Sequence, residues 1–317
     1  MAKDSEKTGR RSSILRWPWG RRRVATSDGN DGAVHEPAVE VTPGADGSRW
    51  AEVRGLRLHY RVSGRRGGTP VVVLHGLMGH AREWDAAIDL LAPDHEIWAL
   101  DQRGHGRSDW AEDYARSTMA EDLIAWLEAT GLQDPVVMGH SMGGTVALLA
   151  AARRPELFGR LVIVDVAPTP AQGDLQAWLR EYLEELGSAS YATVEEALAV
   201  RSGGPRARPE LVRRFVEHNL DRGEDGRLRW RFDARGLVGS LDSISVPALW
   251  EATDAVRCPV LLLRGEHSLE LPVDLADQMV RRLGEARLGT VTGAGHDVAQ
   301  EQPEQVAQAV REFASGA

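Results

Sequence analysis

One serine of this chain lies in a sequence context that can make its hydroxyl a nucleophile. Ser141 is the central residue of Gly139-His140-Ser141-Met142-Gly143, a G-x-S-x-G pattern between a predicted strand and a predicted helix. Small flanking residues allow a tight turn that exposes the hydroxyl, and the first amides of the following helix favour negative charge beside it. The pattern therefore predicts a nucleophilic serine.

A serine hydroxyl is a poor nucleophile unless a base accepts its proton, so a histidine must come close to Ser141. The best candidate is His296, in a Gly-Ala-Gly-His-Asp loop between the last predicted strand and the last predicted helix. His75, His105 and His140 lie in turns of the same architecture, where we expect them to brace the backbone. The sequence therefore predicts His296 as the general base.

Alternating strand and helix patterns supply the elements that would position these residues. Continuous apolar runs such as Pro70–Leu74 and Leu161–Val164 predict strands buried on both faces. The other predicted strands span 51–53, 56–62, 96–100, 135–138, 258–263 and 286–291, and the predicted helices span 82–91, 119–130, 142–153, 273–283 and 304–313. This rhythm predicts an α/β fold with an open, mostly parallel sheet of eight strands and helices on both faces.

A helical, charged segment interrupts this rhythm between two consecutive strands, at about 169–251. We expect it to form a lid over an active site at the sheet edge. Trp178, Trp230 and Trp250 are dispersed in the segment and favour an apolar acyl pocket. We expect its arginines to lie on a solvated lid face; they are residues 201, 206, 208, 213 and 214.

The N-terminal part of the chain, residues 1–47, lacks helical and strand periodicity, so we expect a disordered basic arm and a linker. Residues 1–23 hold eight basic and two acidic side chains, which allows weak contact with an anionic surface. No run approaches the roughly 20 apolar residues that span a bilayer, so we expect no stable membrane insertion. The folded domain is then expected over 48–317.

Composition excludes several classes of protein. The 317 residues carry a net charge of −9, which disfavours binding to nucleic acid. The one cysteine, Cys258, cannot form an internal disulfide, and no Cys/His cluster has zinc spacing. Neither G-x-G-x-x-G nor a P-loop lysine follows any predicted strand. We therefore expect a cytoplasmic protein that needs no metal or cofactor; the composition leaves its oligomeric state open.

Four motifs, in order along the chain, match one known family. They are His75–Gly79 after the third strand, Asp101–Ser108 after the fourth, Gly139–Gly144 around the serine, and Gly295-His296 before a helix that starts at Glu301–Glu304. From about Trp50 to its C-terminus the chain resembles the α/β-hydrolase fold superfamily. The resemblance implies that fold, but it is much less specific for the substrate, because the fold hosts many reactions.

The acid that would orient His296 departs from the commonest pattern of this superfamily. Most members place an aspartate after strand seven, where this chain has Ser268. Asp165 ends the preceding apolar strand, at the carboxyl edge where open α/β sheets keep their sites. A subset of small serine carboxylesterases combines Asp-x-x-Pro after strand six with Arg-Gly-x-x-Ser after strand seven, and this chain contains both. The resemblance favours Asp165, with Glu270 and then Glu266 as alternatives.

The resemblance also implies an oxyanion hole and a reaction. The backbone N–H groups of Met142 and Leu77 would hold the oxyanion, and Ser141 would cleave small or medium, largely apolar carboxylic esters through an acyl-enzyme. Two alternatives use the same triad: hydrolysis of a carbon–carbon bond in a diketone and cofactor-free peroxidation. A non-catalytic protein that binds a ligand or regulates a partner is a further alternative.

Overall fold

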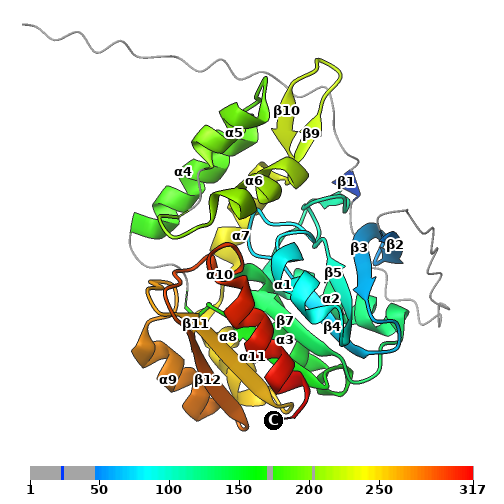
Figure 1. Ribbon diagram of the computed structural model, residues 1–317, viewed down its shortest axis with the longest axis vertical. Coiled ribbons are helices and arrows are strands. Elements are labelled where there is room, and N and C mark those ends of the chain that lie inside the picture. The colour runs from blue at the N-terminus through cyan, green and yellow to red at the C-terminus, as the bar shows by residue number, and fades with distance from the viewer. Residues whose placement is uncertain (1–22, 25–46, 170–173, 202–203, 317) are drawn as a thin grey trace, which may run out of the picture.

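The computed structural model describes residues 23–24, 47–169, 174–201 and 204–316, and a twisted eight-stranded sheet forms its centre (Figure 1). The strands follow the spatial order β12-β11-β8-β7-β4-β5-β3-β2. Their bounds are β2 (Ser48–Val53), β3 (Leu56–Gly64), β4 (Thr69–Leu74), β5 (His95–Leu100), β7 (Val136–His140), β8 (Arg160–Val164), β11 (Val260–Gly265) and β12 (Ala286–Val291). All neighbours are parallel except the antiparallel pairs β2–β3 and β3–β5. The predicted α/β fold class is confirmed.

The central strands are the continuous apolar runs of the sequence. Val71–Leu74 of β4, all of β7 and Leu161–Val164 of β8 are buried. A strand covered by helices on both faces needs apolar side chains on both faces, which an alternating pattern would not supply. Parallel strands bring their carboxyl ends to one edge of the sheet. The residues that follow β4, β7, β8 and β12 are therefore neighbours in space.

Helices cover both faces of the sheet (Figure 1). On one face lie α1 (Asp85–Leu91), α10 (Val298–Glu301) and α11 (Pro303–Ala314); on the other lie α2 (Arg116–Thr130), α3 (Met142–Arg153), α8 (Val246–Ala255) and α9 (Val273–Arg282). Ile88 and Val310 belong to the core of the first face, and Leu123, Val146 and Leu249 belong to the core of the second. The sheet thus has a separate apolar core on each side.

Between β8 and β11 the chain forms further helices and a hairpin. They are α4 (Asp174–Ser188), α5 (Val194–Val200), α6 (Pro209–His218), β9 (Leu220–Arg222), β10 (Leu228–Trp230), α7 (Ala234–Ser240) and a short 3-10 turn (Leu241–Ser243). We call these elements the cap. In Figure 1, α4, α5, α6 and the hairpin lie at the top, above the sheet.

The cap differs from the expected lid in two respects. The antiparallel pair β9–β10 was not expected, because strands of three residues are too short to show a periodicity. The expected range 169–251 also ends inside α8, and α8 packs against α3 in the layer on the sheet. The change of layer comes at Val246, where Pro247 in the first turn helps to start a new helix.

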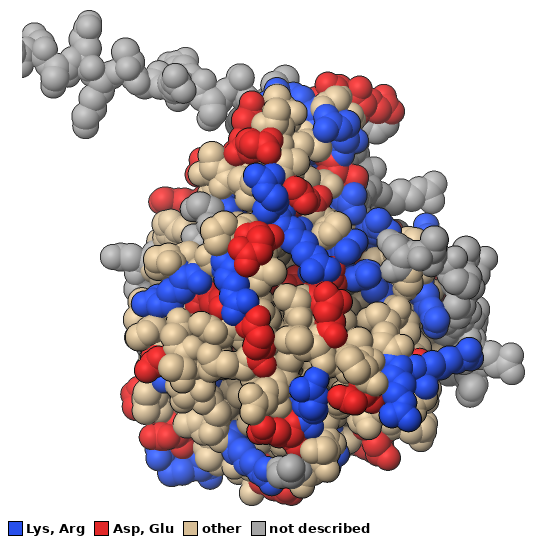
Figure 2. Space-filling view, viewed as in Figure 1, with Lys and Arg blue, Asp and Glu red and all other residues tan. Residues whose placement is uncertain are grey.

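Two arginines join the cap to the helices on the sheet. Arg208 Nη1 lies 2.7 Å from Glu304 Oε1 of α11, and Arg214 Nη2 lies 3.0 Å from Asp85 Oδ2 of α1. The expectation of a solvated lid face misses both contacts, because the acids come from distant parts of the sequence. Figure 2 shows acidic and basic side chains interspersed on this side of the molecule, over the cap and below it.

The N-terminal range holds one short pairing that its composition did not predict. Arg23–Val24 forms β1, which pairs in parallel with β6 (Trp110–Ala111). The other residues up to 46 lie outside the described part of the chain, so the expectation of a disordered arm is not tested. Among the described residues, no helix combines the length and the apolar character needed to cross a membrane.

Candidate active site

The turn that carries Ser141 is crowded and has an unusual backbone conformation. Ser141 has φ of 50° and ψ of −114°, a region that residues other than glycine rarely adopt. Its N–H donates to the Val164 carbonyl at 2.9 Å. A Cβ at Gly139 would lie 2.3 Å from the Gly143 carbonyl oxygen, and one at Gly143 would lie 2.7 Å from the His75 carbonyl oxygen. The flanking glycines are therefore a steric requirement of the β7–α3 turn.

His296 and Asp165 meet beside this turn. His296 Nδ1 lies 2.8 Å from Asp165 Oδ2, although the residues are 131 positions apart. Asp165 is fully buried and its second oxygen accepts from the Gly265 N–H at 2.8 Å. Because a carboxylate oxygen accepts, Nδ1 is the donor, and in the neutral imidazole His296 Nε2 is then the acceptor. Ser141 and His296 line the same cavity, but Ser141 Oγ makes no hydrogen bond to a described residue.

Ser268 occupies the position where an aspartate is usual, and it contacts the same carboxylate. Ser268 Oγ donates to Asp165 Oδ2 at 2.5 Å. It accepts in turn from the N–H groups of Glu270, at 3.1 Å, and Leu271, at 3.3 Å. The family resemblance counts Ser268 as part of the Arg-Gly-x-x-Ser motif that favours Asp165, but it does not predict a contact between the two side chains. The contact forms because β8 and β11 are neighbouring parallel strands, which the structure shows and the sequence alone does not.

Neither of the two alternative acids, Glu270 and Glu266, forms a hydrogen bond with His296. Glu270 lines the cavity and makes no hydrogen bond to His296. Glu266 Oε2 accepts from the Gly293 N–H at 2.8 Å and lies 3.8 Å from His267 Nε2. Of the three candidate carboxylates, the structure brings only Asp165 to the imidazole.

The surroundings of His296 favour its protonated form. Burial alone would lower its pKa, but the hydrogen bond to Asp165 and the charge of that carboxylate oppose the effect. The charges of Asp297 and Glu270 act in the same direction, and together they raise the pKa of His296 to about 9. The imidazole is therefore a stronger base than a free histidine, and it becomes neutral only at alkaline pH.

The two residues whose backbone N–H groups are expected to hold an oxyanion, Leu77 and Met142, both line the cavity. Leu77 and Met142 line the cavity with Ser141, and neither N–H donates to a described residue. The chain around Leu77 is held firmly. His75 Nδ1 donates to the Gly76 carbonyl at 2.8 Å, and the Met78 N–H donates to a histidine ring at 3.3 Å.

Histidines brace these turns, as expected from their positions. His75 Nε2 accepts from the Gln102 N–H at 3.0 Å, and the ring that accepts from Met78 is that of His105. His140 Nε2 donates to the carbonyl oxygen of His296 at 2.9 Å, which fixes the backbone of the candidate base. Each of these histidines therefore supports the backbone of the site through a hydrogen bond.

A cavity of about 320 Å³ opens between the sheet edge and the cap. Its apolar lining includes Leu175, Leu179, Leu241 and Ile244. Of the three tryptophans expected to form a pocket, only Trp178 lines it. Trp230 is buried and its Nε1 donates to the Tyr191 hydroxyl at 3.1 Å, and the guanidinium of Arg282 lies 4.7 Å from the ring centre of Trp250. The pocket expectation is wrong for Trp230 and Trp250, because both face other parts of the protein.

Comparisons with known proteins agree with this architecture. Residues 69–303 match the family described as alpha/beta hydrolase fold. The chain is 32% identical to esterase Rv0045c of Mycobacterium tuberculosis over 76% of this chain and 81% of the esterase. It is 27% identical to the mouse (Mus musculus) sn-1-specific diacylglycerol lipase ABHD11, over 95% of this chain and 99% of the lipase.

Solved structures show the same fold. A crystal structure of esterase Rv0045c has a TM-score of 0.68 and 26% identity, covering 87% of this chain and 94% of that one. The crystal structure of E-2-(acetamidomethylene)succinate hydrolase has a TM-score of 0.76 and 24% identity, covering 84% of this chain and 98% of that one. The chain therefore belongs to the α/β-hydrolase fold family, and within it resembles esterases and lipases.

Proposed function

We propose that this hydrolase is a serine esterase in which Ser141 is the nucleophile, His296 the general base and Asp165 the acid that orients it. The observation that carries the proposal is the 2.8 Å hydrogen bond between His296 Nδ1 and Asp165 Oδ2, next to the strained turn at Ser141. This bond leaves Nε2 to accept the serine proton. The similarity to esterases and lipases supports an ester as the substrate.

The reaction would proceed in two acyl transfers. Ser141 Oγ attacks the carbonyl carbon and its proton passes to His296 Nε2. The N–H groups of Leu77 and Met142 stabilise the negative oxygen of the tetrahedral intermediate, where losing one such donor costs about 3 kcal/mol. His296 then gives its proton to the departing alcohol and leaves an acyl-enzyme. Water attacks this ester with His296 again as base, and the acid is released.

The cavity supports small or medium, largely apolar esters. Its apolar lining includes five leucines, Ile244 and Trp178, and its volume of about 320 Å³ limits the size of the acyl and alcohol groups. In this proposal the cap acts as the lid that covers Ser141, and residues 1–47 take no part in catalysis. With one cysteine, Cys258, the chain needs no oxidising compartment for an internal disulfide, and we place the reaction in the cytoplasm.

A fluorophosphonate probe and a panel of nitrophenyl esters of increasing chain length test the proposal. The wild-type protein should react with the probe and cleave the short esters. Ser141→Ala should lose both activities and keep its far-ultraviolet circular dichroism, whereas Ser188→Ala, at the exposed end of α4, should keep both. Undiminished labelling of Ser141→Ala, or a wild-type protein that cleaves no ester of the panel, would overturn the proposal.

A further inference from the structure

An arginine with unused hydrogen-bond donors lines the cavity that contains Ser141. Arg116 is the first residue of α2 and is only 5% exposed. Its Nη1 donates to Ser240 Oγ at 3.2 Å and lies 3.9 Å from Met119 Sδ. Nε and Nη2 make no hydrogen bond to a described residue. A guanidinium carries five N–H donors, so most of its capacity is unspent.

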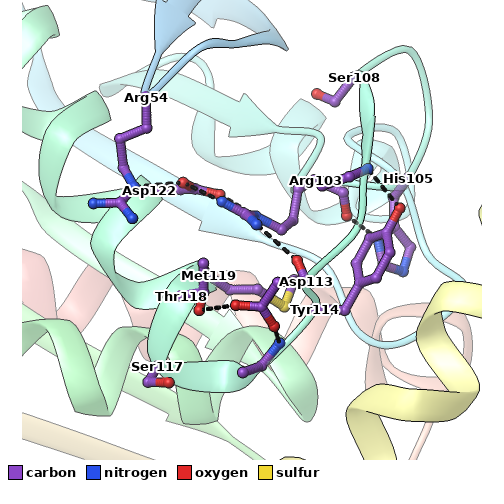
Figure 3. Close-up of polar contacts among 12 residues, drawn as sticks. Arg54, Arg103, His105, Ser108, Asp113, Tyr114, Ser117, Thr118, Met119 and Asp122 are labelled. Atoms are coloured by element: carbon purple, nitrogen blue, oxygen red, sulfur yellow. Dashed lines mark hydrogen bonds and ion pairs between the residues drawn. The ribbon is translucent and has the colours of Figure 1, made fainter. Parts of the chain in front are cut away.

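Two acids close to Arg116 in sequence, Asp113 and Asp122, are engaged by other donors (Figure 3). Asp113 accepts from the Thr118 hydroxyl and from a backbone N–H at 2.8 Å. Asp122 receives two hydrogen bonds from Arg103, the second at 2.7 Å. These contacts also hold the start of α2 in place. Within the described part of the chain, no carboxylate forms an ion pair with Arg116.

A buried cation of this kind is costly unless an anion meets it. Burial lowers the pKa of Arg116 to about 10, so the guanidinium remains charged at neutral pH. Buried charges in proteins are normally paired, because removing them from water costs several kcal/mol per ion. Asp233, the acid that precedes α7, is also engaged by other donors: it accepts from the Tyr114 hydroxyl at 2.9 Å and from the Gly236 N–H at 3.1 Å.

The carboxylates of the cavity gather at its histidine end, and its lining holds one further arginine, Arg201. Glu83 lies 3.3 Å from His140, and Glu270 and Asp297 act on the pKa of His296. Arg116 instead contacts the cap, through Ser240 of α7 and beside the cavity-lining residue Leu241. The cavity thus has carboxylates near the imidazole, an apolar lining, and a cation where α2 meets α7.

We propose that Arg116 binds a carboxylate carried by the substrate, so that the preferred esters have an apolar body and one anionic end. The inference rests on the proposed esterase function and names its substrate class. A carboxylate suits the site because a guanidinium presents parallel N–H donors that match its two oxygens. The α2 start, fixed by Arg103 and Asp113, holds the fork in position before the substrate arrives.

Two matched pairs of esters locate the anionic group. For the acyl side, nitrophenyl adipate (the monoester) is compared with nitrophenyl hexanoate, which has a methyl group in place of the carboxylate. For the alcohol side, meta-carboxyphenyl butyrate is compared with meta-tolyl butyrate. The readout is the ratio of kcat/KM for the anionic member to that for its neutral partner. One of the two ratios should fall roughly 10- to 100-fold in Arg116→Met, since a hydrogen bond to a charged group is lost.

Two further variants test whether the change in the kcat/KM ratio comes from the guanidinium of Arg116. Arg116→Lys keeps the charge but not the fork, so its ratio should lie between those of the wild type and Arg116→Met. Arg201→Met is the matched control: Arg201 also lines the cavity, but its guanidinium lies 5.3 Å from the ring centre of Phe215 and is partly exposed. It should leave both ratios unchanged. Ratios that stay the same in Arg116→Met, or that fall equally in Arg201→Met, overturn the assignment.

A binding measurement separates this inference from the esterase proposal. Adipate dianion should raise the Tm of the wild type and not that of Arg116→Met. That variant should fold, because it replaces an unpaired buried cation with an apolar side chain. If the wild type cleaves no ester but adipate still raises its Tm through Arg116, the esterase proposal fails and the anion site stands. No adipate effect in either protein, with active neutral esters, overturns the anion site alone.

Discussion

Ser268 and Asp165, at the ends of neighbouring strands, share a hydrogen bond from the serine hydroxyl to the carboxylate oxygen that faces His296. Two parallel strands, β8 and β11, create the contact by placing their carboxyl ends side by side. The negative charge thus comes from one strand, and the group that holds it comes from the next. The serine in the usual acid position therefore holds the carboxylate that contacts His296.

Removal of the Ser268 hydroxyl should lower catalysis without abolishing it. A hydrogen bond to a charged group is worth enough to change kcat/KM roughly tenfold, and the carboxylate would still be held by Gly265. Ser268→Ala should therefore lose about tenfold, measured on a short nitrophenyl ester. Ser268→Thr keeps the hydroxyl and is the matched control. Equal losses in both variants would point to packing instead of the hydrogen bond.

Asp165→Asn should be far more damaging than changes at the other acids. An amide cannot stabilise the imidazolium and favours the wrong tautomer, which can cost roughly 10⁴-fold in kcat. Glu270→Gln and Glu266→Gln keep the contact at 2.8 Å between Asp165 and His296 and should stay within about tenfold. Retention of most activity by Asp165→Asn would contradict its role.

A second change can test whether the acid is transferable between strands. The double variant Asp165→Asn, Ser268→Asp places a carboxylate at the end of β11, next to the lost one. Its kcat should be more than about tenfold higher than that of Asp165→Asn, since a carboxylate near His296 Nδ1 restores the correct tautomer. No recovery would mean that only the buried end of β8 orients the imidazole.

The pH dependence should follow His296. Only the neutral imidazole can accept the serine proton, so kcat/KM should rise with pH, with a midpoint near the pKa of about 9 and above the ordinary value of 6.5. In Asp165→Asn the midpoint should move to lower pH, because the main group that raises the pKa is gone. The measurement is kcat/KM against pH at constant ionic strength. A wild-type midpoint at or below pH 6.5 would contradict this prediction.

The raised pKa of His296 also affects stability: stability should fall as the pH rises, whereas kcat/KM should increase. Because the folded-state pKa of His296 is raised, protonation stabilises the folded protein fully below pH 6.5. That contribution is lost as the pH rises through about 9. The wild type should therefore lose more of its Tm between these pH values than His296→Gln does.

Trp178→Ala should change the preference for chain length. Its side chain is 52% exposed and lines the cavity, so its loss widens the space for long esters and affects the smallest ester least. Trp230→Ala should instead lower stability by about 3–5 kcal/mol, because it empties a buried site. Its relative rates along the ester series should remain those of the wild type. Uniform loss across chain lengths in Trp178→Ala would remove it from the pocket.

Much of the framework was determined by local patterns in the sequence. Apolar runs of five or six residues rich in valine and isoleucine favour strands buried on both faces, and the glycines around Ser141 favour a tight turn. The position of His296 follows in the same way, from a loop after the last strand. Such signals are local, so the fold class and the places of Ser141 and His296 were predictable without coordinates.

Contacts between distant segments were decided only by the tertiary structure. Asp165 and Ser268 are 103 residues apart in the sequence. They meet because β8 and β11 are paired in the sheet, although the cap separates them in the sequence. The short hairpin β9–β10 is stabilised by strand pairing, which leaves no periodic pattern in six residues. Arg116 is one arginine among many in the sequence. It becomes a candidate anion site only because folding buries it in the cavity wall while Asp113 and Asp122 pair with other groups.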